Sequence, residues 1–262
     1  MREIVVKSLE NFIELYTEYY SNGDDYFRGQ ANASWDITPS IARNRKVFDK
    51  IVDVEHKLII KLKAKLIEYD LIKFIPTDTD IQKADWLFLA SAQHYGLPTR
   101  LLDFSFHKDV ALGFALLDPN NFNNDSAFII YKQASLFQVD LDSVDNSPNC
   151  KNTFLHIPIR YYKEDNENRL SESRKSIQCS RFFFRETEKL FCCLSLDRHH
   201  SVRLEKIIIP KELKSTIVSH FLKNKKIITN PYRFSNDIDF WAGVYKSEYS
   251  NLNEEKIETF LM

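Results

Sequence analysis

Residues 93–117 read QHYGLPTRLLDFSFHKDVALGFALL, and the order of patterns in this stretch decides the fold class that we expect. Gly96, Leu97 and Pro98 form a strong stop for the helix that precedes them. Residues 99–106 are extended or turn-like, and residues 109–117 form a short buried helix of small and apolar residues. The stretch therefore marks the point where a mainly helical half of the chain changes to a half made mostly of strands.

The flanking sequence extends this pattern in both directions. Before the stretch, helices are predicted at 7–20, with Ser8 as the cap, at 47–73 and at 81–95, and a short aromatic strand at 26–30. After it, the sequence predicts a helix at 211–223 and strands at 126–131, 136–141, 154–159, 180–184, 190–194 and 204–209. We therefore expect an α+β fold in which N-terminal helices pack on a mixed or antiparallel sheet, with residues 1–262 forming a single domain.

Glycine is scarce, and this scarcity excludes two common classes of nucleotide-binding protein. The chain has 5 glycines among 262 residues, far below the ~7% of an average protein. Neither the Gly-x-Gly-x-x-Gly turn of dinucleotide-binding folds nor the Gly-x-x-x-x-Gly-Lys phosphate loop can be written with them. Any nucleotide must therefore be bound without a glycine-rich loop.

Charge and cysteine content favour a cytoplasmic protein. The 36 Lys and Arg balance 37 Asp and Glu, so the chain has no overall attraction to nucleic acid, although local basic runs remain. The first twenty residues carry too many charges for a signal peptide, and no apolar stretch is long enough to span a bilayer. We therefore expect no membrane association. The four cysteines, Cys150, Cys179, Cys192 and Cys193, lack the spacing of a zinc site, so we expect reduced thiols and no metal.

The segment from Gln93 to Asp103 carries the highest density of chemically capable side chains. His94 is of a residue type that can titrate near neutral pH, Arg100 has a planar fork suited to phosphate, and Thr99 or Asp103 can hold a ribose hydroxyl. The structural alternative is that Arg100 and Asp103 form an ion pair and that His94 satisfies a helix end.

The strand at 26–30 is the second candidate, because Arg28 stands between an aromatic residue and Gly29. Such an arginine either presents its guanidinium to a cleft or lies on the surface, and the glycine lets a ligand or another backbone approach closely. Later in the chain, Glu186 and Glu188 place two carboxylates on one face of an extended segment, and Gln178 precedes an aromatic strand.

Together these segments resemble the FRG domain, a family of bacterial and phage-associated proteins. The resemblance runs over about residues 20–245 and is most specific from Gln93 to Asp103. It includes Phe27-Arg28-Gly29-Gln30, Trp35, Pro39-Ser40, Arg43, Glu55, Ala111 and Phe114-Ala115, and continues more weakly through Arg174, Gln178, Phe183 and Ile207–Pro210. The sequence departs from the family after Gln178, where Cys179-Ser180 replaces the usual glycine.

The order of these elements is similar to that of ADP-ribosyltransferases: an aromatic-Arg-Gly strand, a Ser- or Thr-bearing strand followed by a helix, and a late polar residue. The resemblance implies an ADP-ribosyltransferase-like split sheet and NAD as a substrate. It implies NAD contacts from Arg28, Gly29, Gln30, Thr99, Arg100 and Ser105. It assigns catalysis to Arg28, His94, Tyr95 and Asp103, with Gln178, Glu186 or Glu188 as the late residue.

The implied reaction transfers ADP-ribose as nicotinamide leaves, through an oxocarbenium-like transition state that needs positioning more than nucleophile activation. The expected role is a toxin or antiphage effector that modifies nucleic acid, foremost RNA, or a translation component, with a neutralising antitoxin as a candidate partner. Two alternatives remain open. One is a non-catalytic module that binds nucleotides or nucleic acid, and the other is a nuclease that uses His94 with Asp103.

Overall fold

The computed structural model describes residues 1–18, 25–44, 50–71, 81–94, 96–132, 138–140, 153–156, 180–184, 203–223 and 237–262. The helices are α1 (Leu9–Glu18), α2 (Ile51–Glu68), α3 (Ile81–His94), α4 (Lys108–Leu116), α7 (Lys211–Lys223), α8 (Asp237–Ser250) and α9 (Glu254–Leu261). Short 3-10 helices occupy η1 (Ser40–Arg43) and η4 (Pro119–Asn121). The strands are β1 (Arg2–Val5), β2 (Tyr26–Gln30), β3 (Leu101–Ser105), β4 (Ser126–Tyr131), β5 (Gln138–Asp140), β6 (Thr153–His156), β7 (Ser180–Phe184) and β8 (Leu204–Ile209).

Local sequence signals set the ends of the predicted helices. The Ser8 hydroxyl accepts a hydrogen bond from the backbone N–H of Asn11 at 3.2 Å, so Ser8 caps α1 as expected. At the end of α3, Gly96 has a φ of 95°, its N–H donates to the Gln93 carbonyl, and the Leu97 N–H donates to the Ala92 carbonyl. These two bonds and the left-handed glycine form a Schellman motif, which ends the helix where the sequence predicts it.

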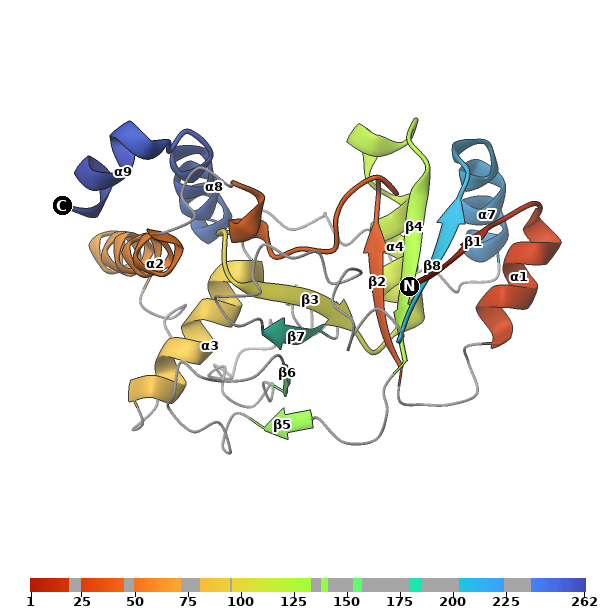
Figure 1. Cartoon of the computed structure of the whole chain (residues 1–262), viewed down its shortest axis with the longest axis horizontal. Helices are drawn as coiled ribbons and strands as arrows, with labels where there is room; N and C mark the ends of the chain where they lie inside the picture. The colour runs from red at the N-terminus through yellow and green to blue at the C-terminus, as the bar shows by residue number, and fades with distance from the viewer. Residues whose placement is uncertain are drawn as a thin grey trace.

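The strands form one mixed sheet with the order β1-β8-β4-β2-β3-β7-β6-β5. The β1–β8 and β5–β6 pairs are parallel, and the other neighbours are antiparallel. The fold class is therefore α+β, and the expectation of a mixed sheet is confirmed. One residue pair, Phe27 with Ser105, joins β2 to β3, whereas β2 and β4 are paired along their full length. Figure 1 shows that β2 and β3 run in different directions from this joint.

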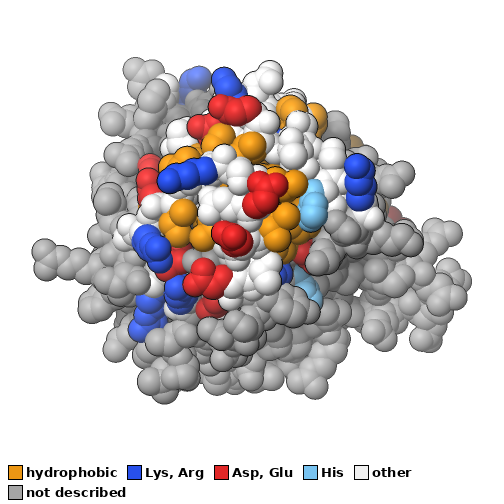
Figure 2. All heavy atoms as spheres, turned by 90° about the vertical axis from the view of Figure 1, so that its right-hand side faces the viewer, with side chains coloured by type: hydrophobic (Ala, Val, Ile, Leu, Met, Phe, Trp, Pro, Cys, Tyr) orange, Lys and Arg blue, Asp and Glu red, His pale blue; other side chains and the backbone are white. Residues whose placement is uncertain are grey.

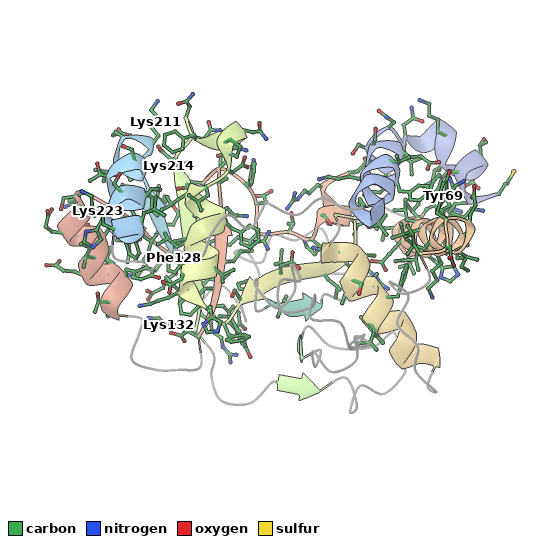
Figure 3. The ribbon with its side chains drawn as sticks, turned by 180° about the vertical axis from the view of Figure 1, so that it is seen from behind. Tyr69, Phe128, Lys132, Lys211, Lys214 and Lys223 are labelled. Atoms are coloured by element: carbon green, nitrogen blue, oxygen red, sulfur yellow. The ribbon has the colours of Figure 1, made fainter. Side chains whose placement is uncertain are left out.

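Two groups of helices lie at opposite ends of the sheet (Figures 1 and 3). α1 and α7 pack with α4 on β4 and β8, in a core that includes Phe12, Phe128, Ile207 and Phe221. At the other end, Leu58 and Leu62 of α2 pack with Tyr245 and Tyr249 of α8 and with residues of α3 and α9. The expectation that the N-terminal helices pack on the sheet is thus confirmed for α1, whereas α2 packs mainly against the C-terminal helices.

A buried lysine ties α7 to the neighbouring loops. Lys214 is 1% exposed, and its ammonium donates to the backbone carbonyls of Ala31 at 3.3 Å and Asn121 at 3.0 Å. Figure 3 shows Lys214 between the exposed ends Lys211 and Lys223 of the same helix. Burial lowers the pKa of Lys214, and Asp125 and Asp118 partly oppose this shift. Its carbonyl contacts indicate a structural role.

The surface over α1 and α7 has no dominant charge. Figure 2 shows acidic and basic side chains interspersed with apolar ones on this face. No described helix combines the length and apolar character that crossing a membrane requires.

Candidate functional site

The fork between β2 and β3 places an arginine and an aspartate side by side. The strands part next to the Phe27–Ser105 pair, and Arg28 and Asp103 lie on the two arms of the fork. The Arg28 Nη1 donates a 2.6 Å hydrogen bond to the backbone carbonyl of Asp103. The guanidinium thus spans the opening, and the two predicted residues, 75 positions apart in sequence, are brought together.

Gly29 is required by the helix behind β2. A Cβ atom at this position would lie 1.8 Å from the Ala111 carbonyl oxygen and 2.6 Å from the Ala115 amide nitrogen, both in the backbone of α4. Of the two partners that the sequence allowed for Gly29, a ligand or another backbone, the structure places the backbone there. Gly29 therefore sets the distance between β2 and α4, and through it the position of Arg28.

A cavity of about 480 Å³ opens beside the fork, within the usual range of ligand-binding pockets. Its wall combines the β2–β3 fork, the end of α3, η1 and the last turns of α8. The lining residues are Arg28, Ser40, Arg43, Asn44, Gln93, Gly96, Leu97, Pro98, Leu101, Leu102, Asp103, Lys246, Tyr249 and Ser250. Seven of the eleven residues in the predicted segment from Gln93 to Asp103 therefore line one cavity together with Arg28.

The cavity carries more positive than negative charge. Its described lining includes the cations Arg28, Arg43 and Lys246, and Asp103 is its acidic residue. Within the described part of the chain, Arg43 and Lys246 form no ion pair. Cations nearby but outside the cavity do: Arg100 pairs with a glutamate of α2 and Lys61 with a glutamate of α8. This balance favours an anionic ligand, because unpaired cations at a concave surface focus positive potential.

Asp103 combines a buried carboxyl with an open hydrogen-bonding position. Burial raises its pKa above the ordinary value, and Arg28, the hydrogen bond from Gln93 and Arg43 oppose this shift only in part. Gln93 Nε2 donates to Asp103 Oδ2 at 3.1 Å, whereas Oδ1 is buried and accepts no hydrogen bond from the described residues. A buried polar atom in this state can accept a hydrogen bond from a ligand or exchange a proton with it.

Thr99 holds this arrangement in place from behind. Its hydroxyl donates to Gln93 Oε1 at 2.5 Å and accepts from the Leu101 N–H at 3.2 Å, and its own N–H donates to the Ser40 hydroxyl. Thr99 is fully buried, so the structure shows it orienting Gln93, and through Gln93 the Asp103 carboxyl.

The Arg100 side chain points to α2. Its Nε donates to Glu55 Oε2 at 2.7 Å, and its backbone N–H donates to Glu55 Oε1 at 2.6 Å. Both side chains are largely buried, with 15% and 5% exposure. The structural alternative paired Arg100 with Asp103; the structure instead pairs Arg100 with Glu55, which fixes the start of β3 against α2.

A second, smaller hollow of about 200 Å³ lies on the α4 side of the fork and shares Arg28 and Asp103 with the larger cavity. Its wall is mostly aromatic and apolar, with Phe27, Gly29, Ala31, Trp35, Phe104, Ser105, Ala111 and Phe114. Ser105 is 5% exposed, and its hydroxyl accepts a hydrogen bond from the His107 N–H at the start of α4. Arg28 and Asp103 therefore stand between a cationic compartment and an aromatic one.

The remaining predicted residues are placed as follows. Gln30 is buried beside the fork, where its Nε2 donates to the Asp36 carbonyl and its Oε1 has no hydrogen-bond partner among the described residues. His94 is the last residue of α3, and the structure describes its backbone alone. Outside the described residues lie Tyr95, Gln178, Glu186, Glu188 and the four cysteines.

The sequence did not predict the contribution of α8. Lys246, Tyr249 and Ser250 line the larger cavity, although no helix was expected in this region. Arg43 and Asn44 also line the cavity. The sequence feature that could have identified Arg43 as a site residue is its position just after the Pro39-Ser40 motif. No group of three His, Cys, Asp or Glu side chains in the described ranges could hold a metal ion.

Comparison with known proteins gives one match. No curated protein and no solved structure matches the chain. The family model of the FRG domain matches residues 24–124, which span β2, the helices α2 to α4, the fork and the Gln93–Asp103 segment. The match ends before the strands β4 to β8 and before α8. The match begins just before the strand that carries Phe27-Arg28-Gly29, and the expected resemblance to the FRG domain is confirmed over residues 24–124.

Proposed function

We propose that this protein is an NAD-dependent ADP-ribosyltransferase whose donor binds at the β2–β3 fork. The observation that carries the proposal is the position of Arg28 and Asp103, which form the shared wall of a cationic cavity and an aromatic hollow. A nucleotide has matching parts, because its phosphates are anionic and its rings are flat and apolar. We propose that the diphosphate of NAD binds in the larger cavity and that one of its rings binds in the smaller hollow.

NAD fits these residues without a glycine-rich loop. Phosphates are commonly bound by backbone N–H groups at such loops, but arginine and lysine side chains serve the same purpose. The planar guanidinium of Arg28 can bind two oxygens at once. The open Oδ1 of Asp103 is suited to accept a hydrogen bond from a ribose hydroxyl next to the phosphates.

NAD would supply ADP-ribose when the bond from its ribose C1′ to the nicotinamide nitrogen breaks and an acceptor atom bonds to C1′, losing its proton. Arg28 would hold the donor in position beside the fork, since its own orientation is fixed by the Asp103 carbonyl. Burial raises the pKa of Asp103, which makes its carboxylate a stronger base. Asp103 would therefore take up the proton that the acceptor loses.

The acceptor is proposed to be RNA, another nucleic acid or a translation component, as for a toxin or antiphage effector in the cytoplasm. The formal charge of -1 and the mixed charges on the α1–α7 face in Figure 2 argue against a protein that wraps a nucleic acid. The acceptor would therefore reach the protein locally, at the mouth of the larger cavity. A neutralising antitoxin would act by covering that mouth.

The decisive experiment measures nicotinamide release from NAD and transfer of labelled ADP-ribose to RNA and protein from a lysate. We expect both with the wild-type chain, loss of both with Arg28→Ala, and normal activity with Arg2→Ala, which removes an arginine from the edge strand β1. Absence of nicotinamide release and of any labelled macromolecule would overturn the proposal. RNA cleavage without NAD would instead favour a nuclease.

A second candidate is a nucleotide-binding module without turnover. The excess of cations over carboxylates in the described lining of the larger cavity favours binding and does not by itself imply catalysis. This function predicts salt-dependent NAD binding with no nicotinamide release at any acceptor concentration.

A further inference from the structure

The C-terminal helix α8 lies outside the part of the chain that matches the FRG domain, yet it forms one wall of the larger cavity. Lys246, Tyr249 and Ser250 come from its last two turns. The residues that line this cavity therefore come from two distant parts of the sequence. The family-matching part supplies the fork, and α8 supplies the opposite wall.

The position of α8 is fixed by several contacts with η1 and α2. Asn44 Nδ2 donates to the backbone carbonyls of Tyr249 at 3.1 Å and Leu252 at 3.2 Å, at the C-terminal end of the helix. The Tyr249 hydroxyl donates to the Ile41 carbonyl, and the Tyr245 hydroxyl donates to the Lys61 carbonyl at 3.3 Å. Because Asn44 directly follows Arg43, these bonds fix the helix that carries Lys246 to the segment that carries Arg43.

The three cations line different parts of the cavity. Arg28 and Arg43 both act electrostatically on the Asp103 carboxyl at the fork, whereas Lys246 is exposed on α8. Within the described residues, Lys246 has no ion pair, so it is free to bind a ligand anion. Two cations beside Asp103 and a third on α8, all in one cavity, suit a ligand with two adjacent anionic groups.

We propose that Lys246 binds the outer phosphate of a diphosphate, so that α8 makes the site selective for nucleoside diphosphates over monophosphates. This inference rests on the proposed binding of a nucleotide in the larger cavity and does not require ADP-ribosyl transfer. Lys246 is then a specificity-determining residue outside the FRG domain match.

The chain offers a matched control for a surface lysine. Lys256 lies on α9, the helix that follows α8, is exposed, and does not line either cavity. Lys256→Ala removes one positive charge, as Lys246→Ala does, but from α9 and outside the cavity. A general electrostatic effect would change ligand affinity in both variants, whereas direct binding of a phosphate changes it in one.

Isothermal titration calorimetry with ADP and AMP tests the proposal on the full chain, and NAD serves as a second diphosphate. For Lys246→Ala we expect the Kd of ADP and of NAD to rise about tenfold, the effect of losing one charge-assisted hydrogen bond, and the Kd of AMP to rise less than twofold. Lys246→Arg is expected to restore most of the ADP affinity. Lys256→Ala is expected to leave all three affinities unchanged.

Equal losses for ADP and AMP, or no loss for ADP, would overturn the assignment of Lys246, as would failure of the wild-type chain to bind ADP. Failure of the proposed activity gives a different result. In that case ADP binding and its dependence on Lys246 persist, while NAD yields no nicotinamide.

Discussion

Arg28 donates a 2.6 Å hydrogen bond from Nη1 to the backbone carbonyl of Asp103, across the point where β2 and β3 separate. The bond fixes the guanidinium beside the Asp103 carboxyl and at the boundary of both hollows. The same arginine is therefore part of the joint between the two halves of the sheet and part of the candidate binding site.

Replacement of Arg28 separates these two roles. Arg28→Ala removes a charge-assisted hydrogen bond, so we expect a loss of stability of about 1.5–3 kcal/mol together with loss of NAD binding. Arg28→Lys keeps the charge but not the planar fork, so binding should fall less than in Arg28→Ala and remain below wild type. Thermal unfolding and titration calorimetry measure the two effects. Unchanged NAD affinity in a folded Arg28→Ala variant would remove Arg28 from the site.

Gly29→Ala is expected to destabilise the protein by about 3 kcal/mol or more, because the three nearest atoms that its Cβ would meet all belong to the backbone of α4 and cannot rotate away. Urea unfolding measures the change. A near-neutral result would show that α4 can move away from β2.

Gly96→Ala is the matched control for a conformational effect. Its Cβ would meet no atom within 4 Å, but its φ of 95° disfavours any side chain. We expect a loss of about 1–2 kcal/mol, measured by the same urea unfolding, and a smaller loss for Gly96→Asn, since asparagine tolerates left-handed backbone. Equal effects of alanine and asparagine would contradict the conformational explanation.

Glu55→Ala leaves the largely buried Arg100 without its carboxylate, so we expect a loss of about 3–5 kcal/mol. The pair of Lys65 and Glu68 on the same helix is much more exposed and provides the comparison, and Glu68→Ala should cost far less than Glu55→Ala. Chemical unfolding of both variants checks the difference. Comparable losses would show that burial does not strengthen the Arg100–Glu55 pair.

Stability should depend on pH through Asp103. Its pKa is raised in the folded state, so its contribution is fully present below the unfolded-state pKa, near 3.9, and is lost as pH rises through the folded-state pKa. Asp103→Asn removes this titration while keeping an oxygen that can accept from Gln93. Its stability relative to wild type should therefore increase from pH 4 to pH 7, as measured by unfolding at each pH. A decrease over this range would show that the Asp103 pKa is lowered.

Local patterns predicted the individual elements well. The bounds of β2, β4, β7, β8 and α7 agree with those expected, and Gly96 ends α3 as its position before Leu97-Pro98 indicates. These signals act over a few residues, through backbone conformation and alternation of apolar side chains, so the sequence displays them directly. The short strand β1 and the helices α8 and α9 were missed, because their stability comes from packing: Tyr245 and Tyr249 of α8 are buried against α2 and η1.

The candidate site was predicted in part. Arg28 and Asp103 were both identified, and the structure brings them within one hydrogen bond. Thr99 and Arg100 carry the chemistry expected of ligand-binding residues, but they are held by Gln93 and Glu55. Their roles depend on which residues the fold places opposite them, and spacing along the chain does not contain that information.

The sequence by itself determined the α+β class, the exclusion of glycine-rich nucleotide loops and the two segments around Arg28 and Asp103, since residue type and short-range pattern suffice for these. Only the tertiary structure decided that β2 and β3 meet at one pair, that Gly29 faces α4, and that Lys246 completes the cavity. Each of these depends on contacts between segments far apart in the chain, whose geometry is set by packing of the whole sheet and its helices.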